Sequence, residues 1–145
     1  MPYNIYDNPD FFEGYSQFRR SREGLAGAPE WPTLRSMLPP LEGLRVLDMG
    51  CGFGAFARWA REIGAASVLG VDLSENMLAR ARAQTQDPKV TYYLADIENL
   101  ELPDASFDLV YSTRSKSPSA PNWPMKFIAR HFFSLQHGSS FRCTD

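Results

Sequence analysis

The stretch from Leu44 to Ala57, LRVLDMGCGFGAFA, constrains the fold more than any other part of this sequence. Apolar residues lead into three closely spaced glycines, Gly50, Gly52 and Gly54, and apolar residues then recur at near-helical spacing. This order predicts a buried parallel strand, a tight turn and the start of a helix. Such a unit gathers free backbone N–H groups and the positive end of a helix dipole at one point, which suits an anionic or strongly polar, nucleotide-like ligand.

Length and composition indicate one soluble globular domain. The chain has 145 residues, of which 43% are apolar and 22% charged, as in ordinary globular proteins. The net charge of -2 provides no basic field, so we expect no nucleic-acid partner. Two cysteines, Cys51 and Cys143, are typical of a reducing compartment rather than of a disulfide framework. We find no signal-peptide pattern and no membrane-length apolar run, and therefore expect a cytoplasmic protein without a membrane partner.

Residues 1–43 are predicted to form an N-terminal helical cap. Aromatic residues recur in FFEGYSQF at a spacing that places them on one helical face, and Tyr15 and Arg19 lie four residues apart on that face. Either these side chains close over a ligand, or the rings pack in the core and the arginine is solvated. A second short helix is expected around Trp31 and Leu34, with Pro32 in its first turn.

The middle of the chain alternates between strand and helix patterns. Strands are predicted at SVLGVD, KVTYYLAD and SFDLVYS, in addition to the strand before the glycines, with helices over about 54–63 and 75–84. Strands that alternate with helices form βαβ units with right-handed crossovers. We therefore predict an α/β fold with a Rossmann-like, doubly wound parallel sheet.

Three acids, Asp48, Asp72 and Asp96, stand at or just after the ends of predicted strands. Ligands of doubly wound sheets bind at that edge, and Asp72 follows Gly52 by 20 residues, the spacing at which an acid meets ribose hydroxyls. The alternative is structural, because an acid in such a position also caps a helix or forms a turn. Three acids around one glycine loop favour a binding site.

The glycine pattern leaves the nucleotide open. The run from Gly50 to Ala55 also fits the dinucleotide fingerprint, so an NAD(P)-linked oxidoreductase remains an alternative. Asp48 argues against it, because a carboxylate beside the loop repels a pyrophosphate and attracts a cationic or ammonium-bearing ligand. Asp96 and Ile97 fit an adenine, the acid bonding to its amino group while the isoleucine packs on its ring.

The runs VLDMGCGFGAFA, GVDLSENML and ADIENLELPDASFDLVYS closely resemble the class I S-adenosylmethionine-dependent methyltransferases. The likeness is to the bacterial small-molecule type related to quinone-biosynthesis enzymes, and it covers residues 44–112. It implies a small-molecule methyltransferase that uses S-adenosylmethionine, with residues 44–112 as the cofactor-binding core. It implies no metal.

The resemblance also implies roles for individual residues. Residues Asp48, Gly50, Cys51, Gly52 and Gly54 should hold the methionine part of the cofactor. Asp72 should bind the ribose, Leu73 and Met77 should lie beside the adenosine, Asp96 and Ile97 should address the adenine, and Ser112 should begin the loop near the methyl group.

The resemblance extends less specifically to the N-terminal cap. Tyr15 and Arg19 would close over the site, with Arg19 near the cofactor carboxylate, and Tyr15 is the only candidate contributor to catalysis that we name. Cys51 is expected to be a packing residue, since no histidine lies near it in sequence. His131 and His137 are expected at the surface.

Residues 113–145 are predicted to form an atypical tail. The run STRSKSPSAPNWP has the composition of a linker, and a helix is predicted over about 123–137. The abrupt change after Ser112 suggests a frame shift or truncation, which would leave a cofactor-binding but catalytically defective fragment. With four strands, the last would have an unpaired edge, through which we expect a homodimer to form. The DNA around the Ser112 codon tests the frame-shift hypothesis.

Overall fold

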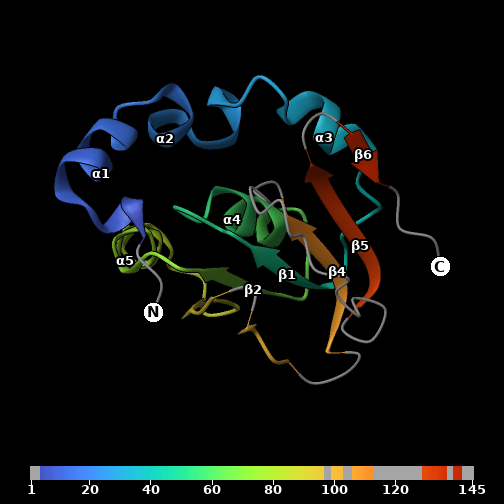
Figure 1. Cartoon of the computed structure of the whole chain (residues 1–145). Coiled ribbons are helices and arrows are strands. Elements are labelled where there is room, and N and C mark those ends of the chain that lie inside the picture. The colour runs from blue at the N-terminus through green and yellow to red at the C-terminus, as the bar shows by residue number, and fades with distance from the viewer. Residues whose placement is uncertain (1–3, 97–98, 103–105, 113–128, 137–138, 142–145) are drawn as a thin grey trace.

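The computed structural model describes residues 4–96, 99–102, 106–112, 129–136 and 139–141. Its elements follow one another along the chain as labelled in Figure 1. In chain order they are η1 (Ile5–Asp7), α1 (Pro9–Ser16), α2 (Arg19–Glu23), η2 (Gly24–Gly27), α3 (Trp31–Met37), β1 (Arg45–Met49), α4 (Ala55–Glu62), β2 (Ser67–Asp72), α5 (Glu75–Gln84), β3 (Val90–Leu94), β4 (Phe107–Ser112), β5 (Ala129–Gln136) and β6 (Ser139–Phe141).

The strands form one sheet in the order β3-β2-β1-β4-β5-β6. All neighbouring pairs run parallel except β5 and β6, which are antiparallel. The chain runs outward from β1 to β3 and then crosses back to β4 on the other side of β1, so the strand order reverses between β1 and β4. This is the switch point of a doubly wound sheet, and it confirms the predicted α/β architecture.

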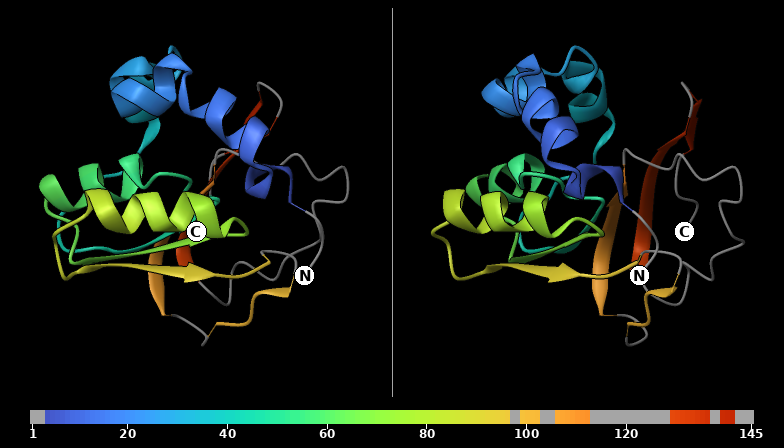
Figure 2. Two further views of the ribbon diagram at one scale, coloured as in Figure 1. Left: turned by 90° about the vertical axis from the view of Figure 1, so that its left-hand side faces the viewer. Right: turned by 60° about the vertical axis from the view of Figure 1, so that its left-hand side comes forward.

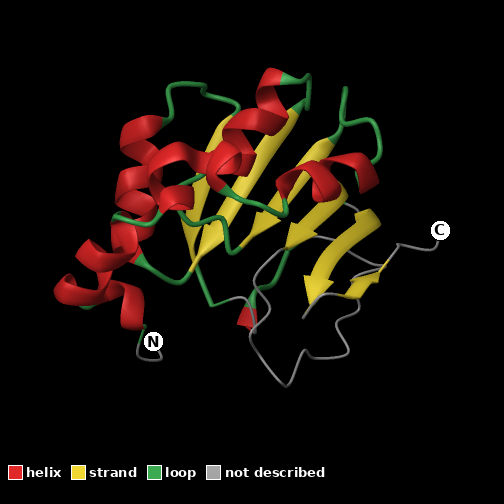
Figure 3. Cartoon of the chain, turned by 90° about the horizontal axis from the view of Figure 1, so that it is seen from above, coloured by secondary structure: helices red, strands yellow, loops and turns green. Residues whose placement is uncertain are grey.

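The described helices lie on one side of the sheet (Figures 2 and 3). Helix α4 packs its buried residues Phe56, Ala57 and Ala60 against inward-facing residues of the strands, such as Val46 and Val68. These side chains bury apolar surface between helix and sheet, which is the main favourable term in folding. None of the described helices has the length and apolar character needed to cross a membrane.

The N-terminal segment folds into short helices, as predicted. Helix α1 begins after Asn8, whose side chain accepts hydrogen bonds from two backbone N–H groups of the first turn, and Pro9 occupies the first helical position. Helix α3 buries Trp31 and Leu34. Trp31 lies edge-on to Trp59 of α4, with ring centroids 4.7 Å apart, so aromatic packing fixes this end of the cap on the core.

The opposite face of the sheet carries a second apolar cluster around Leu47 and Val110. Leu100 and Leu102, from the connection between β3 and β4, pack against it. This connection carries the chain from one side of β1 to the other. It therefore covers the face that α4 and α5 leave free.

The structure corrects two predictions for the tail. Residues 129–136 form strand β5, not part of a helix, and residues 113–128 lie outside the described part of the chain. Strand β5 pairs with β4 along its length. The edge of β4 is therefore occupied, and the expected homodimer through that edge loses its basis.

Candidate functional site

The glycine loop joins β1 to α4 and has the tight, left-handed conformation that glycine permits. Gly50, Gly52 and Gly54 have φ angles of 74°, 56° and 80°, values that L-residues with a Cβ rarely adopt. The N–H groups of Gly50 and Cys51 donate to the carbonyl oxygen of Val71 at 2.8 and 3.0 Å. These loop N–H groups therefore already have acceptors within the protein. The motif predicts N–H groups that are free to bind a phosphate, and these two are not free.

Asp72, the last residue of β2, holds the loop from the neighbouring strand. Its Oδ2 accepts a 2.9 Å hydrogen bond from the Gly52 N–H, and its Oδ1 accepts one of the same length from the Ser74 N–H. Burial raises the pKa of Asp72, while its hydrogen bonds to backbone N–H groups oppose the shift. The 20-residue spacing between Gly52 and Asp72 thus corresponds to a direct contact. The backbone N–H of Leu73 also donates to this carboxylate, which leaves acceptor capacity for one further donor.

Asp48 is a buried carboxylate beside this loop. Its side chain is 3% exposed, and its Oδ2 atom has no hydrogen-bond partner among the described residues. Burial, followed by repulsion from Asp72, raises its pKa to about 8. An unpaired buried carboxyl is costly to stability. A ligand that brings a hydrogen-bond donor to this oxygen would remove the cost.

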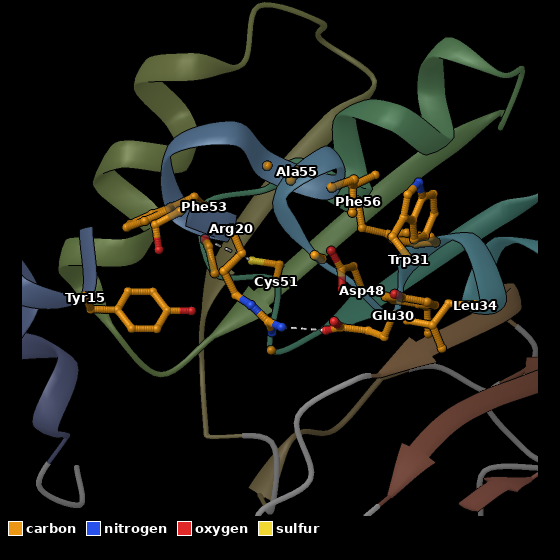
Figure 4. Close-up of a pocket in the computed structure, with 17 residues that line it drawn as sticks. Tyr15, Arg20, Glu30, Trp31, Leu34, Asp48, Cys51, Phe53, Ala55 and Phe56 are labelled. Atoms are coloured by element: carbon orange, nitrogen blue, oxygen red, sulfur yellow. Dashed lines mark hydrogen bonds and ion pairs between the residues drawn. The ribbon is translucent and has the colours of Figure 1, made fainter. Parts of the chain in front are cut away.

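A cavity lies between the N-terminal cap and the glycine loop (Figure 4). Its walls come from two parts of the chain that are distant in sequence. The cap contributes Tyr15, Arg20, Ser21, Gly24, Leu25, Ala28, Glu30, Trp31 and Leu34, and the core contributes Asp48, Gly50, Cys51, Gly52, Phe53, Ala55, Phe56 and Tyr111. The structure therefore brings Tyr15, Asp48 and the first residues of the loop together, as predicted.

The arginine in the cavity is Arg20, not Arg19. Arg19 forms an i,i+4 ion pair with Glu23, leaves 74% of its side chain exposed and does not line the cavity. The predicted shared face with Tyr15 does not exist, because α1 ends at Ser16 and Phe18 is extended before α2 begins.

Arg20 instead contacts Glu30, with 2.7 Å between Nη2 and Oε1 (Figure 4). Among the described residues that line the cavity, Arg20 is the only cation. Sequence reasoning missed both members of this pair. They are ten residues apart, and no periodic pattern connects them.

Aromatic contacts join the cap to the glycine loop. The ring of Phe53 lies edge-on to Tyr15 and to Phe12, with centroids 6.0 and 5.9 Å apart. The guanidinium of Arg80, from α5, lies 4.4 Å from the centroid of the same ring. Tyr15 packs against other rings and also lines the cavity, so its position fits both interpretations of the aromatic stripe.

The other predicted site residues lie at the same edge of the sheet but outside this cavity. In the strand register, Ser112 pairs with Met49. Leu94, which lies two residues before Asp96, pairs with Asp72. Met77 is fully buried and Leu73 partly buried. Asp96 accepts a hydrogen bond from the Asn99 side chain at 2.9 Å.

Two further predictions concern Ile97 and Cys51. Ile97 lies outside the described residues. Burial raises the pKa of the Cys51 thiol, so this cysteine is a packing residue rather than a nucleophile.

A network of polar side chains supports the glycine loop. Arg58 Nη1 donates to the Phe53 carbonyl oxygen at 2.6 Å and to Thr85 Oγ1 at 3.3 Å, and the Thr85 and Tyr92 hydroxyls are 2.8 Å apart. A Cβ on Gly54 would collide with the Tyr92 hydroxyl. The loop thus has a fixed shape before any ligand binds.

Comparison with known proteins identifies the family. Residues 46–134 match the family described as "Methyltransferase domain", a range that continues past Ser112. A curated relative, trans-aconitate 2-methyltransferase from Deinococcus radiodurans, is 39% identical over 132 residues, which cover 90% of this chain and 46% of that protein. Malonyl-[acyl-carrier protein] O-methyltransferase from Pectobacterium atrosepticum is 46% identical over 79 residues, or 54% of this chain and 30% of that protein.

Comparison with solved structures leads to the same family. The crystal structure of an S-adenosylmethionine-dependent methyltransferase from Mesorhizobium loti is 49% identical with a TM-score of 0.70, covering 77% of this chain and 54% of that one. The chain spans half or less of the length of the two curated relatives named above. The matched range includes the glycine loop, all three strand-end acids and β4. The chain therefore belongs to the methyltransferase domain family.

Proposed function

We propose that this chain binds S-adenosylmethionine and transfers its methyl group to a small-molecule acceptor. The observation that carries the proposal is the presence in one cavity of two complementary groups, the carboxyl of Asp48, whose buried Oδ2 has no partner among the described residues, and the guanidinium of Arg20. The amino-acid end of the cofactor has an ammonium and a carboxylate, which complement these two groups. The donor set therefore fits the cofactor.

The other proposed contacts to the cofactor are inferred from residues that lie at the carboxyl ends of the strands. Asp72 would accept a hydrogen bond from a ribose hydroxyl through its remaining acceptor capacity. Leu73 and Met77 would shape the adenosine site, with Asp96 and Ile97 at the adenine. Gly50, Cys51, Gly52 and Gly54 would hold the methionine part, and Ser112 would begin the loop near the methyl group.

Bound S-adenosylmethionine supplies a methyl group on a positively charged sulfur, so the leaving group is already activated. The chain then has to align the acceptor with the methyl group and to exclude water. The aromatic wall of the cavity, which includes Trp31, Phe56 and Tyr111, provides an apolar surface for this. Tyr15 is the candidate for a direct catalytic contribution, since it lines the same cavity.

A dinucleotide fits this site less well. A pyrophosphate needs free loop N–H groups, whereas those of Gly50, Cys51 and Gly52 already donate to Val71 and Asp72. In its ionised form, the carboxylate of Asp48 would also repel a pyrophosphate. A cytoplasmic location remains a prediction from composition.

Isothermal titration of the folded protein with S-adenosylhomocysteine tests the proposed cofactor site, with NAD titrated in parallel. We expect binding of S-adenosylhomocysteine and none of NAD. A protein that is folded by circular dichroism but binds no S-adenosylhomocysteine would contradict the proposal.

Methyl transfer is measured separately with labelled S-adenosylmethionine and an acceptor panel that includes trans-aconitate. Binding without transfer to any acceptor would support the cofactor-binding, catalytically defective alternative.

A further inference from the structure

The carboxylate of Glu30 forms an ion pair with Arg20, the cation that lines the cavity. It stands immediately before α3 but makes no side-chain hydrogen bond to cap that helix. Its Oε1 atom lies 2.7 Å from Arg20 Nη2, and both residues line the cavity together with Asp48. Figure 4 shows this contact beside Asp48. Among the described contacts, Arg20 is the one side-chain partner of the Glu30 carboxylate.

The contact has the features of an exchangeable ion pair. It joins one guanidinium nitrogen to one carboxylate oxygen, whereas guanidinium binds carboxylates best in a bidentate fork. The side chains of Arg20 and Glu30 are 44% and 37% exposed, and ion pairs in such surroundings are weak. A ligand carboxylate with better geometry can therefore displace Glu30, which then turns to solvent.

We propose that Glu30 is an internal competitor that holds Arg20 in the free protein and is exchanged for the carboxylate of the cofactor on binding. This inference rests on the proposed function. Glu30 mimics the ligand carboxylate, keeps the guanidinium oriented toward the cavity and lowers cofactor affinity. The exchange thereby limits how tightly product is retained.

The test compares S-adenosylhomocysteine affinity of the wild type and Glu30→Gln by isothermal titration. Freeing Arg20 should tighten binding about threefold to fivefold, the value of an exposed ion pair. Glu23→Gln is the matched control, because Glu23 pairs with Arg19 away from the cavity. The control should leave affinity unchanged.

Two further arms identify which interaction changes. The affinity for 5′-methylthioadenosine, which lacks the amino-acid group, should be the same in the wild type and in Glu30→Gln. In an Arg20→Gln background, where no exchange is possible, Glu30→Gln should give no gain.

The outcomes separate this inference from the proposed function. If the folded wild type binds no S-adenosylhomocysteine, the proposed function fails and this inference fails with it. If the wild type binds but Glu30→Gln binds no more tightly, only the inference is overturned. The same gain with 5′-methylthioadenosine, or in the Arg20→Gln background, would also overturn it, because Glu30 would then act without exchange.

Discussion

Asp48 shows how a buried carboxyl lowers the stability of the protein that contains it. Its buried carboxyl has a pKa of about 8, so the native state keeps a proton that the unfolded chain releases above about pH 4. The contribution of Asp48 to the free energy of unfolding therefore falls as pH rises from about 4 to 8 and is constant above that range. Natural proteins tolerate destabilising groups of this kind at positions that function requires.

Asp48→Asn should stabilise the free protein and prevent binding of S-adenosylhomocysteine. An amide is neutral in both the folded and the unfolded chain and needs no proton to be buried, so we expect a gain of about 1–3 kcal/mol at pH 8, or several degrees in Tm. The gain should shrink toward zero near pH 4. Thermal melts across this pH range measure it.

The exposed substitution Glu62→Gln serves as the control for Asp48→Asn and should leave Tm within about a degree. An Asp48→Asn variant that is less stable than the wild type at pH 8 would show that the carboxyl has a stabilising partner.

At the scale of elements, the glycine loop depends on side chains from three neighbours. Arg58 from α4 reaches the Phe53 carbonyl oxygen and Thr85, which follows α5, and Tyr92 from β3 closes the network. A polar network of this kind fixes the loop shape in advance, which reduces the ordering cost of binding.

Arg58→Leu should weaken S-adenosylhomocysteine binding about tenfold, because one loop carbonyl loses its charged donor. Titration calorimetry measures the affinity, and Arg58→Lys should recover part of it. Arg61→Leu is the control on the same helix. Arg61 pairs with Asp87 and the Ala65 carbonyl oxygen, so its loss should lower Tm but not affinity. Equal affinity losses in both variants would point to general destabilisation of α4.

The element types were largely predictable, because each predicted strand and helix up to Ser112 has a clear apolar period. Strand β5 was not. Ile128, Phe132 and Leu135 repeat at a spacing that fits a helix, yet residues 129–134 pair with β4. Over a short stretch the pattern does not distinguish helix from strand, and pairing with an open strand edge decides.

At the scale of the whole molecule, the cap and the core are joined by hydrogen bonds and by an aromatic contact. Asp7 accepts hydrogen bonds from Ser74 Oγ at 2.7 Å and from the Asn76 N–H at 3.3 Å. Phe53 makes the aromatic contact described above. A ligand held between cap and core therefore stabilises both parts together.

S-adenosylhomocysteine at a concentration one hundred times its Kd should stabilise the fold by about 2.7 kcal/mol. For a chain of this size that corresponds to a Tm increase of roughly 5–10 °C, measurable by differential scanning calorimetry. The transition should remain single. A ligand-dependent shift in only one of two transitions would show that cap and core unfold independently.

The sequence by itself determined the strand–loop–helix unit, the positions of Asp48 and Asp72, and the family, because these depend on local spacing and on glycine conformation. Only the tertiary structure decided that Arg20 rather than Arg19 faces the cavity, and that Glu30 opposes it. The direction of a side chain after a break such as Phe18 depends on how separate short helices pack. That packing is set by contacts distant in sequence, and no local pattern records it.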